Sequence, residues 1–463
     1  MRDSITPTSS TSPAQQSDPR RVALACMVGT MIEWYDFYIY GMAAALVFGP
    51  QFFPSLSPFA GALASFATFA VGFGARPLGG VILGHFGDRV GRKTVLVVSL
   101  LLMGLSTFAI GLLPTYATIG IWAPILLVVC RFLQGVGLGG EWGGAALMAV
   151  EHAPKGKRGL YGSAISLGIP AGLVLANMAF LIMARLAPDS AFADWGWRVP
   201  FLFSIVLVLV GLWVRLNVAE SPYFKKAQER EEEQRLPVLE LFTTYPRQLL
   251  LAAGSFIGNS AIGYIVIVYL LSYTTTVLNL PRQRILWIVL LSMSVLAITI
   301  TLSARYSDRL GRRRVYLAGS IGLLIWSAAF FPLIDTGSTV LIALAVTVMN
   351  ALSGMVLGPQ PALFAEMFST RVRYSGASLS YQLGALLGGA VAPLAATSLY
   401  EWTGSSWPIT VYLLAVSLIS LVCVWAFSET STRDLGDDDQ DPAVKPGLVT
   451  IELPEAGRDG VAR

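Results

Sequence analysis

Long apolar runs recur along the whole chain and constrain its fold more than any other feature. A helix that spans a bilayer needs about 20 apolar residues. Hydrophobic residues make up 54% of the 463 residues and charged residues only 13%, whereas a soluble domain carries about 25% charged residues. The composition therefore excludes an ordinary soluble enzyme and predicts an all-α membrane protein. We predict twelve spanning helices, at 22–49, 59–84, 94–113, 122–147, 160–185, 199–217, 249–273, 285–304, 315–334, 339–363, 375–399 and 408–427.

The polar segments divide the chain into five parts. We predict a disordered tail over 1–20, a six-helix bundle over 21–217, a linker over 218–248, a second six-helix bundle over 249–428 and a disordered tail over 429–463. Both tails are polar and lack apolar periodicity, as disordered segments do. The linker contains Glu229-Arg230-Glu231-Glu232-Glu233, and is either a solvated amphipathic connection or a regulatory loop.

Lys and Arg are unevenly distributed between the two sets of loops. The set that includes both termini holds most of them, among them Arg89, Lys155 and Arg314. The other set holds only Arg185, Arg198, Arg282 and Arg284. Short loops rich in Lys and Arg stay on the cytoplasmic side, so we expect both termini in the cytoplasm.

The two halves repeat the same polar motif after corresponding spans. The segment GHFGDRVGRK at 84–93 follows the second span, and ARYSDRLGRR at 304–313 follows the eighth. Glu151 precedes Arg158 by seven residues, and Glu366 precedes Arg373 by seven. Such a repeat implies pseudo-twofold symmetry about an axis along the membrane normal, with a substrate site between the halves near mid-bilayer.

The repeated motif predicts a tight turn between two helices at the inner surface. Gly87 and Gly91 permit the turn and a close helix approach, and Asp88 suits the amides of a helix N-terminus. We predict a gate that latches the halves when the cytoplasmic side is closed; the alternative is that the motif only sets topology. The predicted gate comprises Gly84, Asp88, Arg89, Gly91, Arg92, Lys93, Glu151, Arg158, Asp308, Arg309, Gly311, Arg312, Glu366 and Arg373.

This loop motif resembles the signature of the major facilitator superfamily, and the twelve spans agree with it over about 20–428. Four further stretches resemble the metabolite:proton symporter family: EWYDF at 33–37, RFLQG through GEWGG at 131–144, GWRVPF at 196–201 and RVRYSG at 371–376. That family includes porters for 2-oxoglutarate, citrate, shikimate, other organic acids, and proline or betaine. The resemblance implies uptake across a bacterial inner membrane, driven by the proton gradient. One departure is Ala304 in place of Gly84, which predicts a looser helix approach in the second half.

Few charged residues fall inside predicted spans, where a charge costs at least ~2.5–3.5 kcal/mol and marks a functional candidate. Glu33 and Asp36 lie three residues apart, hence on one helical face. They lie ~18 and ~22 Å from the inner surface, and Arg131 lies ~12 Å from the outer one. In a hydrocarbon core of ~30 Å these depths nearly coincide. We therefore expect Arg131 to pair with Asp36, Glu33 or both.

This pairing suggests how protons are coupled to transport. A carboxylate beside a guanidinium stays ionised, whereas one that loses its partner is pushed toward protonation, and arginine does not deprotonate. Asp36 is the predicted proton carrier, Glu33 the second candidate and Arg131 their fixed partner. A structural ion pair that only fixes helix packing is the alternative. Protonation would also free Arg131 to bind a substrate carboxylate.

Other polar residues within the spans have two interpretations each. Glu141 is either a second protonation or gating site, or a satisfied residue at a helix–helix contact. Neutral polar residues either line the substrate cavity or make interhelical hydrogen bonds. These residues are Tyr35, Tyr38, Gln134, Asn177, Asn259, Asn350, Gln360, Tyr381 and Gln382.

Together these features predict proton-coupled uptake of a small organic acid by alternating access. The alternative is uptake of a zwitterionic osmolyte such as proline or glycine betaine, which the lack of further mid-membrane cations would suit; an exporter or a transporter-like sensor comes third. No phosphate-binding loop or catalytic constellation occurs, so we expect no enzyme, no metal site and no cofactor, with protons as the coupling ion. We expect a monomer in the bacterial inner membrane, with a small-molecule substrate and the bilayer as its partners and no nucleic acid.

Overall fold

The computed structural model describes residues 18–187, 191–217, 220–221, 237–433 and 435. Residues 1–17 and 436–463 of the predicted tails, and most of the predicted linker, lie outside these ranges. The described residues are mostly helical and contain no strand. Among them, twelve helices are long and apolar enough to cross a membrane, and each overlaps one predicted span. The predicted fold class is therefore confirmed.

The first half of the chain forms six of these spans. Its helices are α1 (Pro19–Ala43), η1 (Ala44–Phe48), α2 (Gly49–Phe52), α3 (Pro58–Val90), α4 (Arg92–Leu112), α5 (Tyr116–Ile119), α6 (Trp122–Glu151), α7 (Arg158–Gly162), α8 (Ala164–Leu186), η2 (Phe192–Gly196) and α10 (Arg198–Leu216). The η segments are single π-helical turns that continue or precede a span.

The second half repeats this order after the short helix α12 (Pro237–Thr244). Its helices are α13 (Pro246–Tyr264), η3 (Ile265–Tyr269), α14 (Leu270–Thr276), α15 (Arg282–Leu310), α16 (Arg312–Asp335), α17 (Thr339–Leu357), α18 (Gln360–Glu366), α19 (Arg373–Ala385), η4 (Leu386–Ala390), α20 (Val391–Thr403) and α21 (Trp407–Trp425). Segments η1 and η3 occupy equivalent places in the first span of each half.

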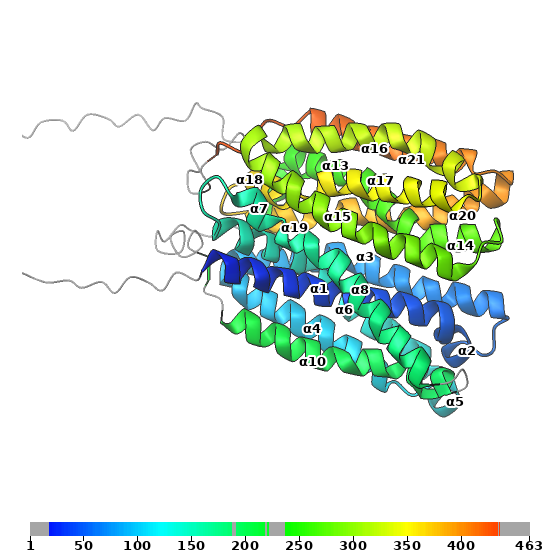
Figure 1. Ribbon diagram of the computed structural model, residues 1–463. Coiled ribbons are helices and arrows are strands. Elements are labelled where there is room, and N and C mark those ends of the chain that lie inside the picture. Colours follow the sequence, from blue (N-terminus) through cyan, green and yellow to red (C-terminus); the bar gives the residue numbers. More distant parts are fainter. Residues whose placement is uncertain (1–17, 188–190, 218–219, 222–236, 434, 436–463) are drawn as a thin grey trace, which may run out of the picture.

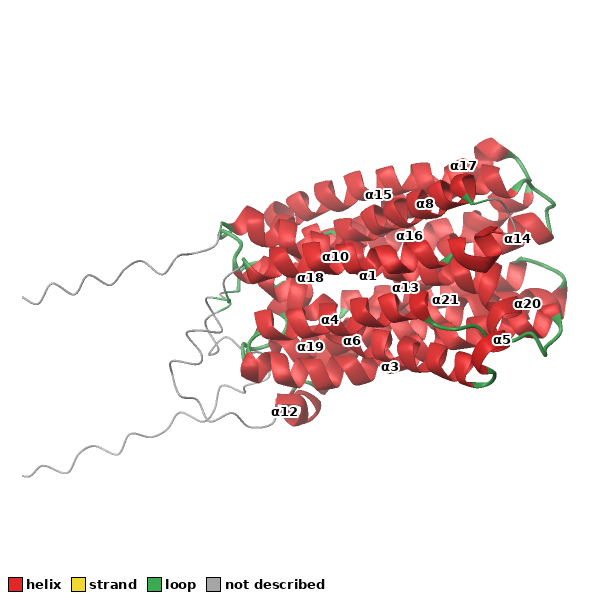
Figure 2. Cartoon of the chain, turned by 90° about the horizontal axis from the view of Figure 1, so that it is seen from below, coloured by secondary structure: helices red, strands yellow, loops and turns green. Residues whose placement is uncertain are grey.

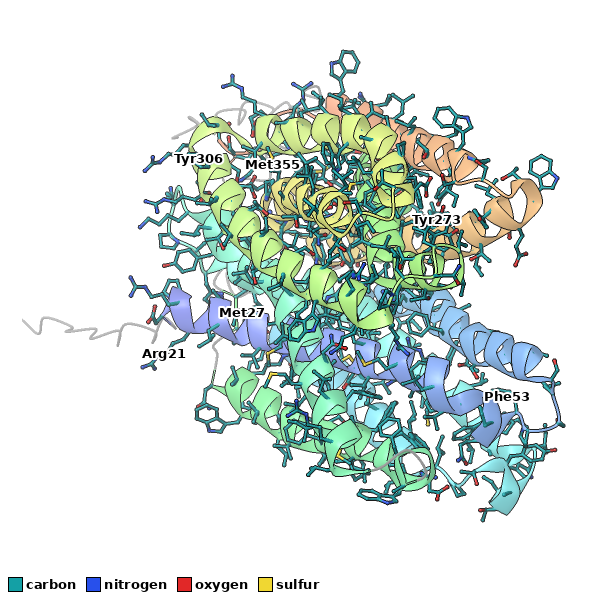
Figure 3. The ribbon with its side chains drawn as sticks, turned by 45° about the vertical axis from the view of Figure 1, so that its right-hand side comes forward. Arg21, Met27, Phe53, Tyr273, Tyr306 and Met355 are labelled. Atoms are coloured by element: carbon teal, nitrogen blue, oxygen red, sulfur yellow. The ribbon has the colours of Figure 1, made fainter. Side chains whose placement is uncertain are left out.

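The helices run roughly parallel to one common direction in both views (Figures 1 and 2). We call the end at which α1 begins and α21 ends the tail end. Arg21 and Tyr306 lie at the tail end, and Phe53 and Tyr273 lie at the opposite end (Figure 3). The repeated motifs at 84–93 and 304–313 therefore lie together at the tail end.

Corresponding helices of the two halves pack in the same way. In the first half α3 and α4 pack on α6, α4 on α10, and α1 on α8; in the second half α15 and α16 pack on α17, α16 on α21, and α13 on α19. The halves meet mainly where α3 and α6 contact α19, and where α15 contacts α7 and α8. The fold is thus two pseudo-symmetric six-helix bundles.

Glycines let the helices of each half approach closely. A Cβ atom at Gly137 of α6 would lie 3.0 Å from the carbonyl oxygen of Ser99 in α4, so glycine favours this close approach. The outer surface is apolar, with Leu291 and Val340 largely exposed, as expected for a surface that faces lipid rather than water.

Candidate functional site

Four charged side chains are buried near the middle of the first half. Glu33 and Asp36 of α1 are 5% and 2% exposed, and Arg76 of α3 and Arg131 of α6 are 5% and 2% exposed. Within the described residues no ion pair of 4.0 Å or less joins them. The expected direct pairing of Arg131 with Asp36 or Glu33 is therefore wrong.

Two neutral side chains link Arg131 to Asp36 instead. Arg131 Nη1 donates to Gln134 Oε1 at 3.0 Å, and Gln134 Nε2 donates to Thr107 Oγ1 at 2.6 Å. The Thr107 hydroxyl in turn donates to Asp36 Oδ2 at 2.7 Å. A hydroxyl can donate and accept at once, so α1, α4 and α6 are joined by one chain of hydrogen bonds. The nearly equal depths of Asp36 and Arg131 predicted that the two residues lie near each other. They did not predict that Thr107 and Gln134 lie between them.

Aromatic rings explain why Arg131 does not reach Asp36. Its guanidinium carbon lies 4.1 Å from the ring centre of Tyr40, 4.6 Å from that of Phe69 and 5.7 Å from that of Phe37. A guanidinium over an aromatic face gains about 2 kcal/mol or more where water is excluded. The rings therefore compensate the positive charge and hold it away from the carboxylates.

Arg76 is a second buried cation, which the sequence pattern did not single out. Its guanidinium carbon lies 4.3 Å from the ring centre of Phe73 and 5.2 Å from that of Phe37. Tyr264 of the second half packs its ring against Phe37 and Phe73, with centroids 5.8 and 5.3 Å away. Arg76 therefore lies beside the boundary between the halves. Its position inside the predicted span 59–84 was the available signal.

An aromatic stack crosses the same boundary. Tyr381 of α19 lies parallel to Trp142 of α6, with ring centres 4.1 Å apart and an angle of 6°. On its other face Phe256 of α13 lies 4.6 Å away at 22°. Next to this stack, Gln382 Nε2 donates to the carbonyl oxygen of Leu138 in α6 at 3.0 Å. The two halves therefore contact each other through side chains at this level.

Of the predicted cavity residues, the structure brings Tyr38, Tyr381 and Gln382 to the boundary between the halves. The ring of Tyr38 lies 5.9 Å from that of Phe37, which in turn lies 5.8 Å from the ring of Tyr264 in the second half. Gln134 belongs to the hydrogen-bonded chain described above.

The remaining predicted cavity residues lie elsewhere. Tyr35 donates to the carbonyl oxygen of Pro200 at 2.7 Å, Asn350 to Ser292 Oγ at 2.7 Å, and Asn177 to the Leu173 carbonyl of its own helix at 2.9 Å. All three contacts stay within one half. Those of Tyr35 and Asn350 join two helices, as the alternative expected, whereas that of Asn177 lies within α8. Asn259 lines a small pocket within the second half, and Gln360 is fully buried.

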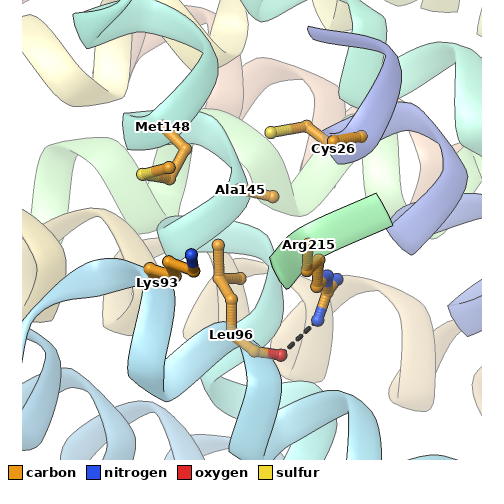
Figure 4. A pocket seen from close by; sticks show the side chains of 7 residues that line it. Cys26, Lys93, Leu96, Ala145, Met148 and Arg215 are labelled. Carbon is orange, nitrogen blue, oxygen red and sulfur yellow. Dashed lines mark hydrogen bonds between the residues drawn. The ribbon is translucent and has the colours of Figure 1, made fainter. Parts of the chain in front are cut away.

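Glu141 forms an ion pair with Arg215 of α10, and it also accepts a hydrogen bond from Ser99 Oγ at 2.9 Å. Arg215 donates to the Leu96 carbonyl oxygen as well, beside a pocket between α1, α4, α6 and α10 (Figure 4). The geometry matches a satisfied residue at a helix contact. Arg215, within the predicted span 199–217, was missed as a buried cation.

The two repeated aspartates cap helices of the opposite half at the tail end. Asp88 of α3 accepts from the backbone amides of Tyr374 and Ser375, at 3.1 and 3.0 Å, where α19 begins. Asp308 of α15 accepts from the amides of Gly159 and Leu160, at 2.8 and 3.0 Å, where α7 begins. Both caps match the expected preference of a carboxylate for helix N-terminal amides.

Two glutamates add reciprocal ion pairs around these caps. Glu151 contacts Arg92 of its own half and, at 3.2 Å, Arg373 of the other half. Glu366 contacts Arg312 at 3.4 Å and, across the boundary, Arg158 at 4.0 Å. Lys93 donates to the Leu216 carbonyl of its own half. Arg309 is exposed, whereas Arg89 is partly buried.

Gly91 and Gly311 form the turns between α3 and α4 and between α15 and α16. Their φ angles are 116° and 102°, which only glycine adopts easily. The expected looser approach at Ala304 is wrong, because the glycine has moved to the opposing helix: a Cβ at Gly159 would lie 2.8 Å from the Ala304 carbonyl oxygen. In the first copy the small residue is Gly84, whose Cβ would lie 3.0 Å from Ser375 Cα.

A second acidic pair near the tail end was not singled out from the sequence. Glu220 accepts from the Lys93 amide at 3.0 Å, and Glu429 accepts from the Arg312 amide at 2.8 Å. Burial acts to raise the pKa of Glu429, but hydrogen bonds from backbone amides outweigh it and hold this pKa below its ordinary value. The signal was an acidic residue shortly after the last span of each half.

The segment after α21 lies across both halves at the tail end. The carbonyl oxygen of Arg433 accepts from Arg158 at 2.7 Å, and that of Leu435 accepts from Arg373 at 2.9 Å. The Leu435 side chain is buried in a cluster with residues of both halves, namely Leu83, Val95, Leu147, Val150, Ala362, Ala365 and Tyr374. This segment therefore contacts the same arginines as the ion pairs.

Within the described residues, no three His, Cys, Asp or Glu side chains are grouped so that they could hold a metal ion. The network at the tail end joins the two bundles through capped helix N-termini and ion pairs.

Comparison with known proteins agrees with this geometry. The family model of the Major Facilitator Superfamily matches residues 26–383 and 264–450. The inner membrane metabolite transport protein YhjE of Escherichia coli is 43% identical over 90% of this chain and 95% of its own. The shikimate transporter of Escherichia coli is 43% identical over 87% and 93%, and its proline/betaine transporter 33% over 90% and 85%.

Solved structures show the same fold. The proton:xylose symporter XylE, bound to 6-bromo-6-deoxy-D-glucose, superposes with a TM-score of 0.73 at 16% identity, over 90% of this chain and 98% of that protein. With twelve spanning helices in two pseudo-symmetric halves, this chain belongs to the major facilitator superfamily and is a multi-pass inner-membrane transporter of metabolites.

Proposed function

We propose that this transporter is a proton-coupled symporter that takes up a small organic acid. The observation that supports this proposal is the set of four buried charges, two acidic and two basic, with no direct ion pair among them in the described part of the chain. Charges buried without direct partners are costly. Binding of a proton or of an anion changes the net charge of this set, and so changes the electrostatic cost of burying it. A transporter can use that change to couple the two binding events.

Asp36 is the proposed proton carrier and Glu33 the second. One oxygen of each carboxylate, Asp36 Oδ1 and Glu33 Oε2, is buried and makes no hydrogen bond. Such an oxygen can receive a proton without breaking an existing bond. Arg131 is linked to Asp36 through Gln134 and Thr107. Protonation of Asp36 removes the negative charge that accepts the Thr107 hydrogen bond, and so weakens the chain that ends at Arg131.

The tail end is the proposed cytoplasmic side, since it carries most of the Lys and Arg residues of the loops. The cross-half caps of Asp88 and Asp308 and the pairs of Glu151 with Arg373 and Glu366 with Arg158 close this side. Alternating access then requires these contacts to break when proton and substrate are bound.

An organic acid suits the site better than a zwitterion. The zwitterionic alternative drew support from an expected lack of further cations in mid-membrane, and Arg76 removes that support. The shikimate transporter among the relatives carries an acid by its name, at 43% identity, whereas the proline/betaine transporter is 33% identical.

The proposal is tested in vesicles that contain the purified protein and have an imposed pH gradient, acidic outside. Labelled shikimate, 2-oxoglutarate, citrate, proline and glycine betaine are offered in turn. We expect gradient-driven accumulation of at least one acid, abolished in Asp36→Asn, while counterflow exchange of the same acid remains measurable. Asp335→Asn serves as the matched control, because Asp335 contacts only Tyr273 and Ser406 of the second half in the described structure. Accumulation that Asp36→Asn leaves unaltered would refute the assignment.

A further inference from the structure

We propose that the carboxylate of the transported acid binds Arg76, together with the hydroxyls of Tyr38 and Tyr264, at the boundary between the two halves. This inference rests on the proposed function and deepens it. It assigns the substrate anchor to a residue other than Arg131, the only buried cation that the sequence had singled out for this role.

The balance of charge requires an anion when a proton binds. With Glu33 and Asp36 ionised, they offset Arg76 and Arg131. A proton on either carboxylate leaves one positive charge in excess, and an uncompensated buried charge costs several kcal/mol. A substrate carboxylate removes that excess, so the proton and the acid each favour binding of the other.

Unused polar groups gather around Arg76. Its Nε atom is buried without a hydrogen-bond partner in the described residues, and so are the Tyr38 hydroxyl and Glu33 Oε2; the Tyr264 hydroxyl lies next to the Arg76 guanidinium. Buried polar groups are normally hydrogen-bonded. Three of these four groups are donors that a carboxylate would satisfy, and the fourth is an acidic oxygen that a proton would satisfy.

These groups are near neighbours. Tyr264 packs on Phe37 and Phe73, the same two rings that Arg76 covers, and Arg76 is the charged group that acts most strongly on Tyr264. Glu33 lies on α1 one turn before Phe37, one of the rings that Arg76 covers. The ring of Tyr38 lies 5.9 Å from that of Phe37, on which Tyr264 also packs.

Arg131 is less suited to the same role. Its guanidinium is stacked on Tyr40 and Phe69, and Nη1 is engaged by Gln134, all within the first half. Arg76 instead covers the two rings on which Tyr264 of the second half packs. A carboxylate held by Arg76 and Tyr264 would therefore join the two halves, as a substrate must do if its binding is to change how they are arranged.

The location also fits the planar aromatic stack of Trp142, Tyr381 and Phe256. Phe256 of the stack and Tyr264 of the proposed subsite both lie on α13, about two turns apart. The body of an acid anchored at Arg76 would meet apolar ring faces, which bind the uncharged part of a ligand. We infer a ligand with one carboxylate at Arg76 and an apolar or cyclic body against these rings.

The test measures ligand-induced thermal stabilisation of the purified, detergent-solubilised protein. The probes are shikimate, 2-oxoglutarate and citrate, each paired with its full methyl ester. We expect wild-type protein to bind at least one acid and to bind its ester at least tenfold more weakly. Arg76→Gln is expected to weaken binding of that acid at least tenfold and to leave binding of the ester unchanged, because a charge-assisted bidentate contact is lost only for the acid.

Three further variants guard against simple misfolding. Arg76→Lys keeps the charge and loses the forked geometry, so affinity for the acid should fall by a smaller factor. Arg185→Gln removes an exposed positive charge far from the site and should change neither affinity. Tyr264→Phe should weaken binding of the acid and leave binding of the ester unchanged.

The outcomes separate this inference from the function on which it rests. If an acid binds wild type and Arg76→Gln equally, the anchor is not Arg76, and proton-coupled acid transport still stands. If wild type binds none of the acids and accumulates none, the proposed substrate class fails, and the anchor with it. If Arg76→Gln does not fold, Arg76→Lys replaces it. The assignment is then overturned if wild type and Arg76→Lys each bind the acid no more tightly than its ester.

Discussion

The Thr107 hydroxyl links the Asp36 carboxylate to the Gln134 amide by two hydrogen bonds. It accepts from Gln134 and donates to Asp36, at 2.6 and 2.7 Å. Thr107→Val keeps the shape and removes the hydroxyl, which leaves two buried polar groups unpaired at about 1–3 kcal/mol each. The donated hydrogen bond stabilises the ionised form of Asp36.

We therefore expect Thr107→Val to raise the pH at which gradient-driven uptake is half-maximal by about one unit. The measurement is a pH series of initial uptake rates at saturating substrate. Thr107→Ser retains the hydroxyl and should behave like wild type. An unchanged profile in Thr107→Val would show that this chain of hydrogen bonds is structural only.

The ion pair of Glu141 with Arg215 allows its two interpretations to be separated. Removing one partner of a buried pair costs about 3–5 kcal/mol, whereas replacing both by apolar residues is often neutral. Glu141→Leu should therefore lower the thermal stability of the purified protein strongly, and the double variant Glu141→Leu with Arg215→Leu should recover most of it.

Uptake by that double variant decides the role of Glu141. Retained proton-driven uptake is expected, because the geometry shows a satisfied helix contact. A stable double variant that exchanges substrate but no longer accumulates it would instead make Glu141 a protonation site.

At the scale of elements, Glu429 holds the start of α16 to the segment after α21. It accepts from the amides of Arg312, Arg313, Thr430 and Ser431, at 2.8, 3.2, 3.1 and 3.1 Å. Its pKa is held below the ordinary value by these amides, although burial opposes them. A lowered pKa in the folded state means that the stabilisation is fully present above the unfolded pKa and is lost as the pH falls through the folded pKa.

Glu429→Gln is accordingly expected to cost about 1 kcal/mol near neutral pH, as the loss of a helix cap does. The difference in thermal stability from wild type should shrink below about pH 4.5, the ordinary value for a glutamate. Thermal unfolding of both proteins between pH 3.5 and 7.5 measures it. A difference that stays constant down to pH 3.5 would contradict the cap.

Helix-level features could be predicted from the sequence because each depends on local information. The length of the apolar runs predicted the twelve spans, and the spacing of the repeated Asp88 and Asp308 motifs predicted the symmetry. The exchange of glycine between Gly84 and Gly159 could not be predicted, because it depends on which residues of the other half oppose Ala304. The motif around Ala304 does not include Gly159, the residue of the other half that packs against it.

At the scale of the whole molecule, the candidate site could likewise be predicted only in part from the sequence. Depth along α1 and α6 predicted that Asp36 and Arg131 lie in one neighbourhood. It could not predict that Tyr40 and Phe69 cover the guanidinium, since these rings come from other parts of the sequence. Arg76 was missed for a related reason: its function depends on Tyr264, which the fold brings from the second half.

Pseudo-symmetry makes the closure of the tail end a property of both halves together. Asp88 caps α19 of the second half, and Asp308 caps α7 of the first. Neither cap can form unless the bundles are docked, so each cap stabilises only the state in which the tail end is closed. A charge-assisted hydrogen bond contributes about 1.5–3 kcal/mol, which corresponds to at least a tenfold shift in the population of that state.

Asp88→Asn and Asp308→Asn should therefore each shift the protein toward a state that is open at the tail end, and the double variant should shift it further. Distances between spin labels on cysteines that replace the exposed Phe86 and Tyr306 report this opening, in a background without Cys26, Cys130 and Cys423. Asp335→Asn is the control, because Asp335 contacts Tyr273 and Ser406 of its own half at the opposite end. Each single variant should show a longer-distance population that wild type lacks. If only one of the two aspartates changes the distances, closure depends on one half alone, and the symmetric latch is refuted.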